Sequence, residues 1–331
     1  MAGDPGHFFL APRMIDLPAI AADDERLAVF ATVRDLFRYA VSRFNAAALA
    51  YGHGATNAVD EAAFIVLEGL NLPIDALDPF LDARLTRAER ERLIALIDAR
   101  VATRKPAAYL LNKAYIQGEP FYVDERVIVP RSFIGELLFH GLVGPGAPID
   151  EPEAVETALD LCAGGGSLAI LAARVFPNAA IDAVELSPDA LAVARRNVED
   201  HGLVDRVALR QGDLFAPVKT RRYDLILANP PYVDAESLAA FPPEYAAEPR
   251  LAHAGGADGL DIVRRILAEA GAQLTPQGAL VCEVGRARGK LEAVYPDLPF
   301  LWLDAEESEA EGEVFVLRAE DLAPRKRGKG R

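Results

Sequence analysis

Apolar residues in the first third of the chain recur at helical spacing. Between residues 27 and 50 they stand three or four positions apart, which is the period of a helix that buries one face. A second stretch of this kind runs from residue 60 to 70. Thr86 and Glu89 form a capping-box pattern, so a third helix is predicted to begin there and to end before Pro106. This part of the chain is therefore predicted to be helical.

The pattern changes after these helices. Residues 114–123 predict a β-hairpin with a turn centred on Gly118. Residues 124–129 predict a further strand, and residues 133–143 predict a helix. The stretch 144–152 is rich in glycine and proline and indicates a loop at a boundary.

Short apolar runs then alternate with helical patterns. Seven strands are predicted, at residues 157–162, 180–185, 207–211, 223–228, 279–284, 300–303 and 314–317. Helices are predicted between them, notably at residues 168–175, 188–201 and 261–274. This alternation predicts an α/β fold, with a mostly parallel sheet that carries helices on both faces.

Composition narrows the class of protein. The 331 residues are 51% hydrophobic, which is enough for one large or two ordinary domains. There is no apolar run long enough for a transmembrane helix, and the first residues lack the pattern of a signal peptide. The cysteines, Cys162 and Cys282, lie in apolar runs, which suits a reducing cytoplasm and argues against disulfides. The scattered histidines give no metal-binding spacing, so a metal site is not expected.

The net charge of the chain indicates which kind of binding partner it would attract. The net charge is −15, from 50 acidic and 35 basic residues, whereas a protein that grips long nucleic acid needs a basic surface. The balance favours a cationic partner, although negative charge commonly serves solubility alone. Residues 325–331 hold five basic side chains and predict a disordered tail, which is a solvated end or, less expectedly, an RNA contact.

The motif Asn229-Pro230-Pro231-Tyr232 follows the predicted buried strand at 223–228. Open α/β sheets place ligands at this end of their strands. The Asn229 side-chain oxygen and a backbone carbonyl of the motif can accept hydrogen bonds from one planar NH2 group, and Tyr232 can lie against its flat face. The motif therefore indicates a site that holds an amide or amino nitrogen; the plainer interpretation is a turn.

A glycine-rich loop, Gly164-Gly165-Gly166, follows the first strand of the alternating region and leads into a helix. Such a loop lets a ligand approach the backbone and the positive end of the helix. Glu185 ends the next strand, where a carboxylate can accept bonds from both hydroxyls of a ribose. Asp213, after the third strand, could accept a bond from an adenine amino group. These residues suit an adenosine-containing cofactor.

Two such cofactors fit the loop. A nicotinamide dinucleotide needs a third small residue, which Ala169 supplies, so the glycines alone do not decide. The 229–232 motif has no use in hydride transfer, and an acidic site suits the positive sulfonium of S-adenosylmethionine better. Asp160 is placed to face that sulfonium and the cofactor amino group; the alternative is that it caps the loop.

Taken together, these residues resemble a known family. Residues 160–166, Glu185, 212–215 and 229–232 are similar to the class I S-adenosylmethionine methyltransferases, and more narrowly to the HemK/PrmB family of protein glutamine N5-methyltransferases. Residues 244–252, 255–261 and 283–285 are also typical of that family. The resemblance implies a Rossmann-like sheet of seven strands, mostly parallel with one antiparallel strand, and a small helical amino-terminal domain.

Segments in the amino-terminal half indicate which protein substrate the chain would methylate. Residues 51–54, 109–114, 121–127 and 129–132, and residues 295–302 near the end, resemble the group that acts on the third protein of the large ribosomal subunit. Phe133 departs from the proline usual after Pro-Arg-Ser, which leaves the start of that helix uncertain. Leu214 stands where release-factor enzymes often carry an aromatic against the adenine. The resemblance thus implies methyl transfer to a glutamine of this ribosomal protein.

The resemblance also assigns roles to residues. The cofactor-binding residues are predicted to be Asp160, Cys162, Ala163, Gly164, Gly165, Gly166, Glu185, Asp213, Leu214 and Asn229. Asn229, Pro230 and Tyr232 are predicted to be catalytic, and Asn229, Pro230, Pro231 and Tyr232 to bind the substrate. Three alternatives stay open: a methyltransferase of the release-factor GGQ glutamine, an adenine-N6 DNA methyltransferase, and a non-catalytic ribosome-assembly module. Neither a membrane nor a stable nucleic-acid partner is expected.

Five segments are predicted from these patterns. They are a flexible amino terminus (1–23), a helical substrate-recognition domain (24–113), a hairpin and connecting helix (114–150), the catalytic domain (151–322) and a basic disordered tail (323–331).

Overall fold

The computed structural model describes residues 17, 19–21, 24–305 and 312–323. The greater part of the predicted flexible amino terminus and of the basic tail lies outside these residues. The chain forms two compact units. One comprises residues 1–115, 123–125 and 241–248, and the other residues 116–122, 126–240 and 249–331. Within the described residues no helix is long and apolar enough to cross a membrane.

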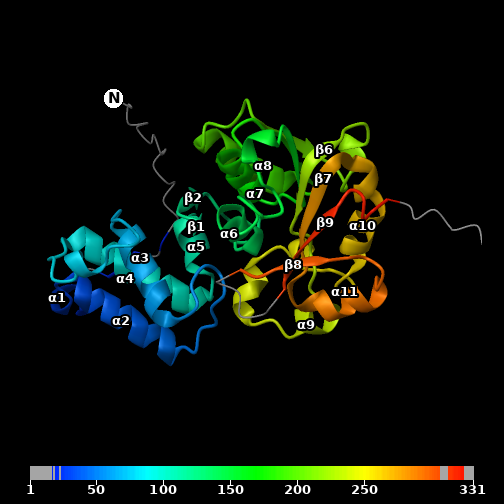
Figure 1. The fold of residues 1–331 in the computed structure, drawn as a ribbon. Coiled ribbons are helices and arrows are strands. Elements are labelled where there is room, and N and C mark those ends of the chain that lie inside the picture. Colours follow the sequence, from blue (N-terminus) through cyan, green and yellow to red (C-terminus); the bar gives the residue numbers. More distant parts are fainter. Residues whose placement is uncertain (1–16, 18, 22–23, 306–311, 324–331) are drawn as a thin grey trace, which may run out of the picture. The chain divides into compact units, whose positions relative to one another are not determined.

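The first unit is helical (Figure 1). Its elements are α1 (Arg26–Val29), α2 (Val33–Ala46), α3 (Ala58–Gly69), η1 (Asp78–Phe80), α4 (Arg87–Thr103) and α5 (Ala107–Leu111). The prediction of one helix over residues 27–50 is wrong, because Thr32 is extended and forms a capping box with Asp35 that begins a new helix. The capping box of Thr86 and Glu89 is confirmed at the start of α4.

A buried ionic group lies inside the helical unit. The Arg100 side chain is fully buried and pairs with Glu61 at 2.9 Å. Its other nitrogens donate to the backbone oxygens of Arg104 and Ala50 at 3.0 and 3.1 Å. Every nitrogen of this guanidinium thus has an acceptor, which offsets the cost of burying its charge.

Residues 241–248 belong to the helical unit, although the chain on either side of them belongs to the other unit. They contain the short helix η4 (Pro243–Ala247). Glu244 is fully buried, pairs with Arg104 at 2.6 Å and accepts a bond from the Ala50 backbone at 3.0 Å. The Tyr245 ring lies 4.3 Å from the His53 ring, measured between centroids. This segment is therefore held among the helices by buried polar and aromatic contacts.

The predicted hairpin is confirmed as β1 (Ala114–Ile116) and β2 (Glu119–Phe121). Its turn is Gln117-Gly118, and both residues have the positive φ that a two-residue turn between twisted strands requires. The strand predicted at 124–129 is wrong, since these residues belong to neither sheet and residues 125 and 126 form a turn.

The helix predicted at 133–143 is present but shorter. It is α6 (Phe133–Phe139), and Ser132 caps its start. It ends early because His140 leaves the helical conformation and Gly141 has a φ of 124°. In the loop predicted after it, Ile149 forms a single β-bridge with Val143, and the short helix η2 (Pro152–Ala154) begins at its end.

The second unit contains a seven-stranded sheet in the order β5-β4-β3-β6-β7-β9-β8. The strands are β3 (Thr157–Leu161), β4 (Ala180–Glu185), β5 (Val207–Gln211), β6 (Tyr223–Ala228), β7 (Leu274–Glu283), β8 (Leu301–Leu303) and β9 (Val314–Arg318). Strands β5, β4, β3, β6 and β7 pair in parallel, and β9 pairs antiparallel with both β7 and β8. The predicted fold, with one antiparallel strand, is confirmed.

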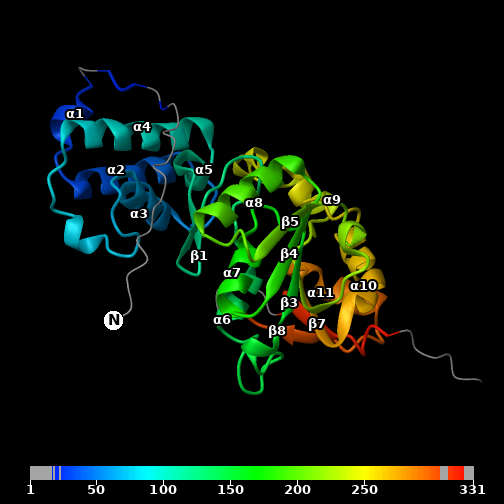
Figure 2. The same cartoon turned by 90° about the horizontal axis from the view of Figure 1, so that it is seen from above.

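Helices cover both faces of this sheet, as Figure 2 shows. The helices of this unit that follow α6 are α7 (Ser167–Val175), α8 (Pro188–Asp200), α9 (Ala235–Ala239), α10 (Asp261–Gln273) and α11 (Arg288–Val294), with the short helices η3 (Ala216–Val218), η5 (Arg250–Ala252) and η6 (Gly285–Ala287). Alternate residues of β6 point to opposite faces. Leu225 and Leu227 pack with α6 and α7, whereas Ile226 and Ala228 pack with α10. Because both faces are buried, the strand reads as a continuous apolar run.

Candidate active site

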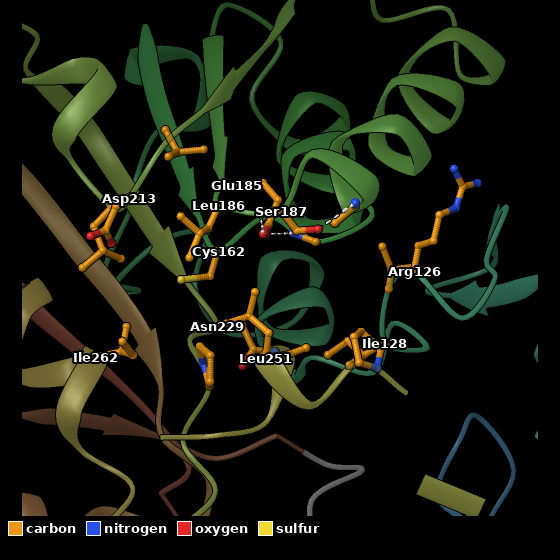
Figure 3. A pocket seen from close by; sticks show the side chains of 18 of the residues that line it. Arg126, Ile128, Cys162, Glu185, Leu186, Ser187, Asp213, Asn229, Leu251 and Ile262 are labelled. Carbon is orange, nitrogen blue, oxygen red and sulfur yellow. Dashed lines mark hydrogen bonds between the residues drawn. The ribbon is translucent and has the colours of Figure 1, made fainter. Parts of the chain in front are cut away.

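A cavity opens at the carboxyl ends of the central strands (Figure 3). It encloses about 830 Å³ of empty space, open solvent at its mouth included. Figure 3 shows the Cys162, Glu185 and Asn229 side chains around it, and these follow or end β3, β4 and β6. Three predicted site regions, separate in the sequence, therefore meet at one cavity. Its wall is lined mainly by apolar groups of the second unit.

The glycine loop turns sharply beside the cavity. Cys162, Gly164 and Gly166 all have positive φ, at 58°, 53° and 80°. A Cβ added to Gly164 would meet nothing within 4 Å, so the space next to this backbone is open. Gly166 instead contacts Ala194 of α8, where an added Cβ would come within 3.3 Å. The loop thus combines an open side towards the cavity with close packing behind it.

A buried asparagine supports the loop from behind. Asn197 of α8 donates to the backbone oxygen of Gly165 at 2.8 Å. It also exchanges two hydrogen bonds with the Tyr122 backbone, at 2.8 and 3.1 Å. Sequence reasoning missed this residue, because an asparagine inside a helix carries no motif. Asn197 therefore fixes the loop to the residue that follows β2.

Glu185 lines the cavity directly beside the glycine loop. Its Oε2 accepts a bond from the Gly164 backbone at 2.8 Å, and its Oε1 accepts one from the Ser187 backbone at 2.8 Å (Figure 3). A carboxylate offers about four lone-pair positions, so each oxygen keeps capacity for a further donor. The side chain lines the cavity and can accept two hydroxyl groups there.

Asp160 lies deeper than the other predicted residues and does not line the cavity. Its Oδ2 accepts a bond from the Ala169 backbone at 3.0 Å, at the start of α7. Its Oδ1 is buried without a hydrogen-bond partner among the described residues. Burial, together with the nearby charge of Glu185, raises the pKa of Asp160 to about 8. A cationic ligand group beside this oxygen would favour the charged carboxylate and lower its pKa.

The raised pKa of Asp160 predicts how stability varies with pH. Between about pH 4 and 8 the native carboxyl keeps its proton while the unfolded chain, with an ordinary pKa near 3.8, has lost it. The native state then binds more protons, so its stability falls as pH rises through this window. We expect Asp160→Asn, which keeps an acceptor for Ala169, to flatten this slope in urea unfolding measured from pH 5 to 9. An unchanged slope would show that other groups set the pH dependence.

Asp213 and Leu214 form the next part of the wall. Leu214 is buried and has a φ of 46°, a conformation that costs energy for a branched apolar residue. Asp213 is half exposed and pairs with Arg265 of α10 at 2.7 Å. Sequence reasoning missed this arginine, which lies 52 positions away. The Asp213 role in binding an adenine amino group stays a prediction.

The motif after β6 reaches the cavity with two of its residues. Asn229 and Pro231 line the cavity, whereas Pro230 is buried and Tyr232 lies outside the lining. The Asn229 side chain makes no hydrogen bond to another residue that the structure describes, so its oxygen and nitrogen stay available.

Several lining residues carry no sequence signal of their own. They include Ile128, Leu186, Leu251 and Ile262, which line the cavity from four separate segments. Leu186 and Leu251 are about half exposed, at 49% and 54%, although both are large and apolar. Exposed apolar walls of this kind are typical of a site that covers a ligand.

Comparison with known proteins decides the family. A family model described as "Methyltransferase small domain" matches residues 149–241. The "Ribosomal protein uL3 glutamine methyltransferase" of Bradyrhizobium diazoefficiens is 60% identical over 294 residues, which is 88% of this chain and 92% of that protein. The protein of the same description from Burkholderia pseudomallei is 53% identical over 300 residues, or 88% and 96% of the two chains. The chain belongs to the uL3 glutamine methyltransferase family. It is an enzyme, and the non-catalytic alternative is not supported.

The uL3 glutamine methyltransferase match covers far more than the 149–241 domain, so it includes most of the amino-terminal region. Among solved structures, a methyltransferase from Pyrococcus furiosus matches with a TM-score of 0.45 and 19% identity. That match covers 67% of this chain and 97% of the other.

Proposed function

We propose that this enzyme transfers a methyl group from S-adenosylmethionine to the side-chain amide nitrogen of a glutamine in ribosomal protein uL3, the third protein of the large subunit. Membership of the family supports both the proposed reaction class and the proposed substrate. The observation that supports the site is the convergence of Glu185, the open Gly164 backbone and Asn229 on one cavity.

The residues present fit S-adenosylmethionine. Glu185 has acceptor capacity for two ribose hydroxyls, and Leu186, Leu214 and Ile262 offer apolar contact for an adenine. The buried Asp160 Oδ1, which has no partner among the described residues, suits a cationic amino group. When bound, this cofactor would supply an electrophilic methyl group. Transfer would break its sulfur–methyl bond and leave S-adenosylhomocysteine, and the substrate nitrogen would lose one proton to water.

The 229–232 motif is proposed to hold the substrate amide. An amide nitrogen is a poor nucleophile, so positioning has to supply much of the rate; well-oriented reactants gain about 7–11 kcal/mol at the upper end. The Asn229 side-chain oxygen and the Pro230 backbone oxygen would each accept one amide N–H, and Tyr232 would lie against the amide plane. Both acceptors bind more strongly as positive charge develops on the nitrogen, which favours the transition state over the ground state.

The helical unit is proposed to select the protein substrate. The methyltransferase domain match begins at residue 149 and so leaves nearly all of this unit uncovered, whereas the uL3 relatives match most of it. An acidic protein with a net charge of −15 would attract a basic ribosomal protein. A ribosomal substrate also agrees with the cytoplasmic location that the cysteine usage predicts.

A substrate comparison tests the proposed function. Purified enzyme and methyl-labelled S-adenosylmethionine are incubated with isolated uL3 and, separately, with a release factor that carries a GGQ glutamine. We expect label on uL3, at a single glutamine located by mass spectrometry, and none on the release factor. Label on the release factor alone would contradict the proposal, and salt-sensitive label on DNA would favour the adenine-N6 alternative.

A further inference from the structure

Glu283 is a buried carboxylate at the end of β7, next to the 229–232 motif. It is 1% exposed and accepts three hydrogen bonds. The Tyr232 hydroxyl donates to Oε1 at 2.8 Å, and the Ser132 hydroxyl and Phe133 backbone donate to Oε2 at 2.6 and 3.0 Å. The donors come from the start of α6 and from the segment after β6, so one carboxylate joins three parts of the chain.

Burying this carboxylate is costly. Burial raises the pKa of Glu283, and the three donors act in the opposite direction by favouring its charged form. An apolar side chain would fill the same place without this cost. Core packing therefore does not explain why a carboxylate stands at this buried position.

Tyr232 is also held on its other sides. A Cβ on Gly285 would come within 2.6 Å of the Tyr232 ring, and one on Gly255 within 2.8 Å of its Cα atom. The backbone after Tyr232 is fixed as well, because Val233 exchanges two hydrogen bonds of 2.9 Å with the chain at His253 and Gly255. Ring, backbone and hydroxyl are thus each restrained, and Glu283 supplies the only restraint on the hydroxyl found among the described residues.

We propose that Glu283 is a positioning residue for methyl transfer: by binding the Tyr232 hydroxyl it holds the ring, and with it the 229–232 motif, in the orientation that receives the amide. This inference rests on the proposed function. Ser132 and Phe133 fix the carboxylate itself, so the three donors act as one unit.

A second tyrosine–carboxylate pair provides a matched control. Tyr223, the first residue of β6, donates its hydroxyl to the buried Asp182 of β4 at 2.7 Å. This pair has the same hydroxyl-to-carboxylate bond, although Asp182 also pairs with Arg210 and Arg221, at 2.5 and 2.6 Å. Neither residue of the pair lines the cavity. If the Tyr232–Glu283 bond served stability alone, removal of either tyrosine hydroxyl would lower stability and leave kcat unchanged.

A double-mutant cycle tests the proposal with uL3 as substrate. We expect Glu283→Gln and Tyr232→Phe each to lower kcat by about 10- to 100-fold, since small misplacements of reacting groups cost this much. The double variant should be no slower than the slower single variant, because both changes break one interaction. The cofactor Kd should stay within about twofold of wild type. Tyr223→Phe should lower the melting temperature and leave kcat unchanged.

Contrary outcomes separate the two proposals. Wild-type kcat in Glu283→Gln, or rate losses that multiply in the double variant, would overturn the positioning role. Absence of label on uL3 with the wild-type enzyme would instead contradict the proposed function. If Glu283→Gln does not fold, Tyr232→Phe, which removes a single hydroxyl, still decides: unchanged kcat would overturn the role, and a lowered kcat with unchanged cofactor Kd supports it.

Discussion

Replacement of Asn229 with alanine is expected to lower kcat for uL3 methylation by about 100- to 1000-fold, the usual effect of removing one hydrogen-bonding group that acts in the transition state. The side chain lines the cavity and makes no hydrogen bond to another described residue, so its loss should not disturb the fold. Cofactor Kd should change by less than about threefold, because the amide and not the cofactor is its proposed partner. Steady-state kinetics and calorimetric titration with S-adenosylmethionine measure the two effects.

Asn229→Asp is the matched variant. It keeps an acceptor oxygen at the same place and replaces the NH2 group with a second, negatively charged oxygen, so it should retain more activity than Asn229→Ala. A parallel loss of kcat and cofactor affinity in the alanine variant would assign Asn229 to cofactor binding instead.

Replacement of Glu185 with alanine is expected to change the cofactor Kd rather than kcat. Hydrogen bonds to a charged group contribute about 1.5–3 kcal/mol each, and two ribose hydroxyls would lose their acceptor. The Gly164 and Ser187 backbones would also lose the group that fixes them around the cavity. Cofactor Kd should therefore rise by about 100-fold or more, while kcat at saturating cofactor should fall much less.

Asp189→Ala serves as the charge control for this variant. Asp189 is exposed in the first turn of α8, four positions from Glu185, and does not line the cavity. Its replacement makes the same change in net charge and should leave cofactor Kd unchanged. Equal Kd for wild type and Glu185→Ala would mean that the carboxylate only supports the loop.

The central strands could be predicted because both faces of the sheet are buried. Residues 180–185 and 223–228 coincide with β4 and β6, since turn residues or helix caps interrupt the apolar runs at both ends. Residues 207–211 coincide with β5, which is the partly exposed edge strand. The same reasoning fails at 124–129, where Val127 and Val129 are buried although they belong to no strand of either sheet. An apolar run shows that residues are buried, but it does not show what lies beside them.

The helix predicted at 27–50 fails for a different reason. Its apolar spacing continues across the break, because α1 and α2 both place apolar residues in one core. Only the cap at Thr32 reveals the interruption, and Asp35 three residues later is the signal that could have found it.

The site could be predicted where a residue type is required by local geometry. Gly164 and Gly166 sit at positive φ, and Glu185 and Asn229 stand at or after strand ends that meet at the cavity. Contacts between distant segments could not be predicted in this way. The Tyr232–Glu283 bond joins residues 51 positions apart, and the Glu283–Ser132 bond joins residues 151 apart.

Residues 241–248 belong to the helical unit, and this limits how the unit can be exchanged between related enzymes. The chain passes between the units near residues 115, 122, 125, 240 and 248, so no single cut separates them. A helical unit grafted from a relative with another substrate would arrive without its own counterpart of Glu244 and Tyr245, which the recipient's catalytic segment would have to supply. Exchange of specificity should therefore require two pieces of gene to move together, and chimaeras that respect only the amino-terminal boundary should fold poorly.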